Sequence, residues 1–351
     1  PVLTLENLEM KKTLVALAAL ASVSAFAQSS VTLYGTIDAS VQNITRINGL
    51  KNGTSYVDGA VSSSVWGLKG SEDLGGGMKA NFQAEGDFMS NNGGTHTTGL
   101  FRRGLNAGVA SSAGELTLGL KTNPIIATGG GMVPVGGNTV TTNLATALGY
   151  ADFYTKNAVT YTSPSIAGMV VQAQHGLSNN SSDAESYGSV NAISGVYTNG
   201  PLTLRAAAQN RRESDNATSA ANAGAAAAAP DQYRTTATSY NKKTQLVGAT
   251  YAVNSALTVS ANRVGSKAAS AFGGAYAAQK NATVLGLGYV VNPALTLGLN
   301  AIHAEDSNLT NVQARYALSK RTTTYAQLTQ ARNDANGRVN FAPVATNTGA
   351  N

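Results

Sequence analysis

Residues 31–42 read VTLYGTIDASVQ, and apolar and polar side chains alternate along the whole stretch. The odd-numbered positions carry Val31, Leu33, Ile37 and Val41, whereas the even-numbered ones are mostly polar. A repeat of two is the side-chain period of a β-strand, and a helix would repeat every 3.6 residues. The stretch therefore predicts one long strand whose two faces meet different surroundings.

The same alternation recurs in segments such as 79–88, 202–209, 295–301 and 311–318. Seven tight turns rich in Gly, Pro and Asn separate the segments: Asp73–Gly77, Ser112–Gly114, Pro164–Gly168, Asn199–Pro201, Asn254–Ser255, Asn292–Pro293 and Ser319–Arg321. Longer polar stretches lie between these turns. A soluble β-sandwich usually has shorter strands and only short connections. Long strands joined alternately by tight and long connections favour an all-β, antiparallel transmembrane barrel.

Composition agrees with a barrel and excludes several other classes. Only 12% of the residues are charged, yet the mean hydropathy is −0.08, as expected when one face of each strand meets lipid and the other meets water. No apolar run is long enough for a helical membrane span. The chain has no cysteine, three separated histidines and no basic run. We therefore expect no enzyme activity, no cofactor, no metal and no nucleic-acid partner.

The N-terminal residues have the pattern of an export signal. Met10-Lys11-Lys12 is followed by an apolar run and then by Ala25-Phe26-Ala27, which fits a cleavage site. We expect residues 1–9 to be an upstream leader and residues 10–27 the signal peptide. Residues 28–351 then form a barrel domain exported to a bacterial outer membrane.

The number of strands suggests that one is missing. Seven tight turns join fourteen strands, and the first stretch brings the total to about fifteen. Bacterial single-chain barrels normally have even numbers, and residues 337–351 show no alternation. We expect sixteen strands in the complete protein, with the C-terminal strand absent from this sequence.

Four motifs resemble the general porins of Neisseria and other β-proteobacteria. They are SVTLYG at 30–35, WGLKGSEDLGGGMKA at 66–80, YTSP at 161–164 and LSKRT at 318–322. The resemblance implies a homotrimer of sixteen-stranded barrels that lets ions and small hydrophilic solutes diffuse through the outer membrane. It also implies that the third long loop, Asn123–Lys156 here, folds into the lumen. The expected surroundings are membrane lipid and lipopolysaccharide.

Charged side chains in a pore decide which ions enter. The candidate pore-lining and constriction residues are Asp38, Lys69, Glu85, Asp87, Arg102, Arg103, Lys121, Asp152, Arg205 and Arg315. The resemblance assigns Arg102 and Arg103 to a paired arginine on the constriction wall. Strict alternation would point Arg103 at lipid, and a bulge or a trimer contact would resolve that conflict.

Two positions depart from the porin pattern. Val65 and Tyr154 stand where relatives often carry arginine, and the third loop has only Asp152 and Lys156 as charges. We therefore expect weak anion preference or near neutrality. The alternatives that the sequence leaves open are a barrel that acts as a surface adhesin or receptor, an outer-membrane enzyme and a secreted soluble β protein.

Overall fold

The computed structural model describes residues 30–45, 53–95, 99–136, 153–177, 189–214, 239–268, 280–304 and 307–333. Apart from one short helix, the regular elements in these ranges are strands. The elements are β1 (Ser30–Thr36), β2 (Ala39–Ile44), β3 (Gly53–Asp58), β4 (Val65–Gly75), β5 (Met78–Asp87), β6 (Gly104–Ser111), β7 (Gly114–Thr122), α2 (Pro124–Gly129), β8 (Tyr154–Thr162), β9 (Met169–Gly176), β10 (Val190–Asn199), β11 (Leu202–Ser214), β12 (Ser239–Ala252), β13 (Leu257–Ala268), β14 (Lys280–Val290), β15 (Leu295–Ala304), β16 (Ser307–Ala317) and β17 (Thr323–Asn333).

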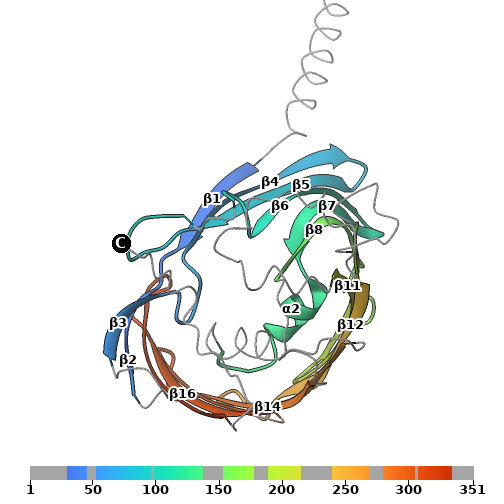
Figure 1. Ribbon diagram of the computed structural model, residues 1–351. Helices are drawn as coiled ribbons and strands as arrows, with labels where there is room; N and C mark the ends of the chain where they lie inside the picture. The colour runs from blue at the N-terminus through green and yellow to red at the C-terminus, as the bar shows by residue number, and fades with distance from the viewer. Residues whose placement is uncertain are drawn as a thin grey trace, which may run out of the picture.

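Fifteen of the strands form one antiparallel sheet in which β1 pairs with β4 and every later strand pairs with its neighbour in the chain. Figure 1 shows this sheet curved into a ring that stays open between its two edge strands, with α2 inside it. The edge strands are β1 and β17. The predicted all-β barrel architecture is confirmed, and each of the seven predicted tight turns joins two successive strands of the sheet.

The prediction of one long first strand is wrong in one respect. Residues 31–41 do not form a single strand, because the chain breaks at Ile37 and Asp38 into β1 and β2. β2 pairs with β3 in a separate hairpin. The backbone N–H of Gly59 donates to the carbonyl oxygen of Asp38 at 3.1 Å, which holds the end of the hairpin at the break.

The two faces of the wall differ as the alternation predicts. On β15, Leu297 and Leu299 are exposed on the outside of the ring, whereas Gly298 and Asn300 are buried on the inside. Exposed tyrosines, among them Tyr251 and Tyr289, lie on the outside of the ring close to the tight turns. This distribution suits a wall with lipid outside and polar groups inside.

Among the described residues, no helix is both long and apolar enough to cross a membrane. The predicted leader and signal peptide lie outside the described residues. So does the region after residue 333, to which the prediction of a missing last strand refers.

Candidate constriction site

After β7 the chain turns into the ring, and Asn123 directs the turn. Its side-chain oxygen accepts from the N–H of Ile125 at 3.0 Å and so caps the first turn of α2. Pro124 follows at the first helical position, where its fixed φ suits a helix start. The Asn123 amide also donates to the hydroxyl of Thr155 on β8 at 3.2 Å. The third loop is therefore tied to the wall where it begins.

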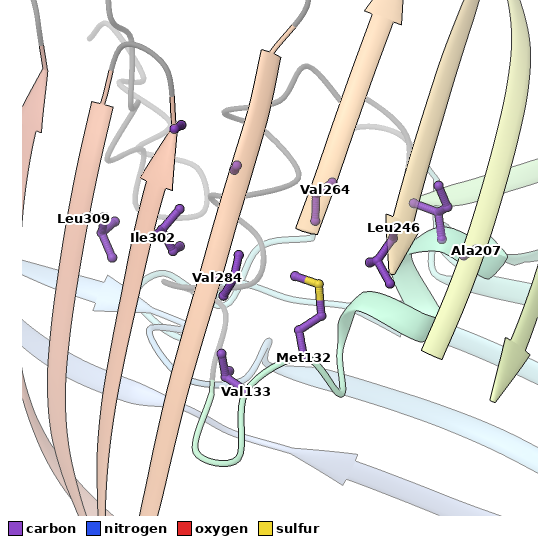
Figure 2. Packing of buried hydrophobic residues seen from close by; sticks show 11 residues of the cluster. Met132, Val133, Ala207, Leu246, Val264, Val284, Ile302 and Leu309 are labelled. Atoms are coloured by element: carbon purple, nitrogen blue, oxygen red, sulfur yellow. The ribbon is translucent and has the colours of Figure 1, made fainter. Parts of the chain in front are cut away.

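The segment from α2 to Val135 packs on the inner face of the wall. Ile125, Met132 and Val133 are buried, and Figure 2 shows Met132 and Val133 among apolar side chains of the strands. The wall contributes Ala207, Leu246, Val264, Ala282, Val284, Ile302, Ala304 and Leu309 to this cluster. Fully burying one such large side chain stabilises by about 1.5–3 kcal/mol. The described part of the third loop thus lies inside the ring, as predicted, and it packs there on an apolar part of the wall.

Three wall amides hold the same segment through its backbone. Asn262 donates to the carbonyl oxygen of Met132 at 2.7 Å, and Asn300 donates to that of Val135 at 2.7 Å. Gln313 donates to the same Val135 oxygen at 3.3 Å. All three side chains are buried, so these bonds satisfy loop carbonyls away from water. They fix the height of the loop against the wall.

Close approach between the loop and the wall depends on glycine. A Cβ at Gly298 would lie 2.6 Å from the Cβ of Val135, and one at Gly288 would lie 2.8 Å from the Cβ of Pro134. A Cβ at Gly286 would lie 2.7 Å from the Cδ of Pro134. Any larger residue at these positions would occupy the space that the loop now fills.

On the other side of the ring, two ion pairs join the end of β5 to the turn before β6. Arg102 forms a bidentate pair with Asp87, whose side chain is only 4% exposed. Arg103 donates to Glu85 at 2.9 Å and lies 3.9 Å from Asp87. Each guanidinium therefore has a carboxylate beside it, and the opposite charges within each pair offset one another.

Polar and aromatic groups surround Glu85 and Arg103. The hydroxyl of Tyr34 donates to Glu85 at 2.8 Å, and the amide of Gln83 donates to that hydroxyl at 2.9 Å. The Arg103 guanidinium lies 5.6 Å from the centre of the Tyr154 ring, a cation–π contact. Tyr154, which replaces an arginine expected from the resemblance, thus supports Arg103 without adding charge.

A cavity of about 240 Å³ lies between this polar wall and α2. Ala127 of α2 lines one part of it, and the remaining lining residues come from the wall: Gln83, Glu85, Arg103, Asn106, Lys121, Thr122, Tyr154 and Gln172. Polar groups thus face the helix across an open space. This open space beside α2 is lined by described residues from both the loop and the wall.

The ten predicted residues do not all gather at this point. Glu85, Arg103 and Lys121 line the cavity, and Asp87 and Arg102 pair beside it. The Lys121 ammonium donates to the hydroxyl of Thr117 at 3.0 Å.

Three other predicted residues lie elsewhere on the inner wall. Lys69 lies over the Tyr34 ring at 5.4 Å, Arg205 donates to Thr250 at 2.8 Å, and Arg315 donates to Gln313 at 2.7 Å. Asp152 lies outside the described residues.

The Arg103 side chain faces the inside of the ring, although strict alternation would point it at lipid. β6 begins at Gly104, so Arg102 and Arg103 lie in the preceding turn, where a period of two does not apply. The backbone N–H of Arg103 donates to the carbonyl oxygen of Glu85 at 3.1 Å, and its side chain follows toward the same residue.

Asp38 is placed differently from the prediction that it faces water. It is 6% exposed and accepts from the backbone N–H groups of Val61 at 2.9 Å and Ser62 at 2.6 Å. Tyr325 on the edge strand β17 donates its hydroxyl to the same carboxylate. Asp38 thus links the β1–β2 break to the far edge of the sheet.

We expect Asp38→Ala to lower the free energy of unfolding by about 3 kcal/mol, because it removes a buried charged acceptor from three partly buried donors. Thermal unfolding followed by circular dichroism measures the change. The control is Asp73→Ala, which removes an exposed carboxylate that accepts from Gly75 in a tight turn at 2.8 Å. Equal losses in both variants would contradict a linking role for Asp38.

Sequence reasoning missed the polar residues Tyr34, Gln83, Asn106 and Gln172 and the wall amides. Each of the four lies at a polar, inward position of an alternating segment, so the alternation itself could have named them. What it could not show is which of the many inward polar residues meet across the ring.

Long antiparallel strands, an apolar outside and a loop seated within a polar ring are the architecture of an outer-membrane β-barrel protein. The family model described as Gram-negative porin matches residues 13–336. The chain therefore belongs to the Gram-negative porin family, which places it in the outer membrane of a Gram-negative bacterium.

Individual relatives agree with this assignment. An outer membrane porin protein of Bordetella pertussis is 32% identical over 235 residues, which are 59% of this chain and 61% of that protein. Outer membrane porin protein 32 of Delftia acidovorans is 40% identical over 112 residues, 31% of each chain. The chain thus spans less than two thirds of these relatives. The structure of an anion-selective porin from Comamonas acidovorans superposes on this one with a TM-score of 0.69 at 22% identity. The match covers 88% of this chain and 90% of that porin.

Proposed function

We propose that the protein is a general diffusion porin, through which ions and small hydrophilic solutes cross the outer membrane passively. The observation that carries this proposal is the open space between α2 and the polar wall. A loop fixed to one side of a ring, facing hydrogen-bonding side chains on the other, leaves a wet passage of restricted width. Nothing in such a passage needs to bind a solute tightly, and conduction requires that binding stay weak.

We propose weak anion preference or near neutrality for this passage. The carboxylates of Asp87 and Glu85 lie beside Arg102 and Arg103, so most of the charge at the constriction is offset locally. Lys121 and Arg205 contribute further positive charge along the inner wall. The balance leaves a small cationic excess, and the anion-selective porin from Comamonas acidovorans has a similar fold.

Membership of the porin family supports a proposal about assembly and surroundings. We propose a homotrimer embedded in lipid and lipopolysaccharide, with no catalytic role. In support of the last point, the carboxylates of Glu85 and Asp87 are both engaged in ion pairs with arginines, which suits a fixed electrostatic wall better than an acid–base pair.

Planar-bilayer recording tests the proposal. We expect stepwise conductance in units of three, and a reversal potential in a tenfold KCl gradient that indicates a modest excess of chloride flux. A bilayer that remains non-conducting in the presence of folded protein would contradict the pore. Strong potassium preference would contradict the proposed selectivity while leaving the pore itself intact.

A further inference from the structure

The outer face of the wall carries an unusual row of polar and basic residues. The strand registers place His175, Asn191, Asn210, Lys243 and Lys267 side by side on β9 to β13. All five are exposed, and Val247 and Val259 lie farther along the same outer face of β12 and β13. The row therefore lies on the face that meets lipid, although its members are not residues that lipid tails favour.

The row lies at the level of a membrane surface. Lys243 is eight residues from Tyr251 on the same strand, a distance of about 27 Å along the strand. With the usual strand tilt this corresponds to roughly 20 Å of depth, close to the height of the apolar band of such barrels. Tyr251 lies beside a tight turn, whereas Lys243 and Lys267 lie at the ends joined by the longer connections. In outer-membrane barrels the longer connections are extracellular, so both lysines belong at the outer leaflet.

In the described part of the wall, the positive charge of this row has no acidic partner on the outer face. Lys243 and Lys267 are direct cross-strand neighbours, an arrangement that is unfavourable between like charges. Arg263 points outward four residues before Lys267, and its guanidinium donates to Thr283 on β14 at 2.7 Å. Among the described outward positions of β10–β14 there is no Asp or Glu. An external anion would relieve the repulsion.

We propose that Lys243, Lys267 and Arg263 form a binding site for the phosphorylated headgroup of lipopolysaccharide. Phosphate accepts charge-assisted hydrogen bonds from ammonium and guanidinium groups, and the acyl chains of the same lipid would lie along the apolar residues below. Arg263 lies deeper than the lysines, and its long side chain can extend along the wall toward the headgroup level. A lipid satisfies both the charge and the depth of the patch, whereas a soluble anion satisfies only the charge. The site rests on the proposed outer-membrane porin function but lies outside the conducting passage.

The test uses the porin extracted in detergent and measures its affinity for diphosphoryl lipid A. We expect the double variant Lys243→Gln, Lys267→Gln to bind about tenfold more weakly or worse, since each basic residue near a charged lipid surface contributes strongly to attraction. Lys243→Arg, Lys267→Arg keeps both charges and should bind like the parent. The matched control, Lys320→Gln, Arg321→Gln, removes two exposed charges from a tight turn at the other end of the barrel and should bind within about twofold of the parent.

Two results would overturn the proposal: unchanged affinity in the Gln double variant, or equal affinity of the parent for lipid A stripped of both phosphates. Competition by millimolar inorganic phosphate that abolishes binding would overturn the choice of a lipid. Conductance of each variant is recorded in parallel and should equal that of the parent, which also shows that the variants are folded. A parent protein that does not conduct would contradict the proposed function. A parent protein that conducts but does not bind lipid A would contradict only this site.

Discussion

Glu85→Gln is expected to raise the chloride-to-potassium permeability ratio by about fivefold. The substitution keeps the size of the side chain and an oxygen for Tyr34, but it removes the negative charge that now lies 2.9 Å from Arg103. A unit charge within about 4 Å changes the energy of a passing ion by about 1 kcal/mol even in water, which corresponds to about fivefold in local concentration. Reversal potentials in a KCl gradient measure the ratio directly.

Two further variants make this result specific. Arg103→Gln removes the opposite charge at the same place and should shift the ratio toward potassium. Glu72→Gln is the matched control, because it neutralises an exposed carboxylate on β4 outside the cavity and should leave the ratio unchanged. If Glu85→Gln and Glu72→Gln had the same effect, the Glu85–Arg103 pair would not be part of the selectivity region.

The wall of this porin could be predicted because its signal is local. A period of two along each segment and glycine-rich turns between them depend only on neighbouring residues, and the structure follows both from β4 to β17. The same rule failed at Asp38, where a side chain that captures the Val61 and Ser62 amides interrupts the strand. It also could not orient Arg103, because the residue lies one position before its strand begins.

The seat of the third loop could not be predicted for a different reason. Asn300 and Val135 are 165 residues apart, and their hydrogen bond exists only because the ring brings β15 beside the loop. A lone Asn or Gly in an alternating segment looks the same whether it faces water or a folded loop. Resemblance to a family supplied the loop's direction, whereas the glycines and amides that receive it emerge only in three dimensions.

Gly298→Val is expected to lower single-channel conductance and to make it noisy. The new Cβ would come within 2.6 Å of the Val135 Cβ, and the wall cannot retreat because β15 is hydrogen-bonded on both sides. The loop must therefore move toward the passage and lose its bond to Asn300, at a cost of about 1–3 kcal/mol for the overpacking alone. Planar-bilayer recordings would show smaller steps with added fluctuation.

The control for this variant is Gly195→Val on the outer face of β10. A Cβ there meets only the Met169 sulfur at 3.6 Å, which is an ordinary contact, so conductance should not change. A Gly298→Val pore that conducts as smoothly as the parent would mean that the segment from α2 to Val135 does not limit the passage. A decrease in Gly298→Val alone would show that the segment around Val135 bounds the passage, since moving this segment changes the flux only where it limits the passage.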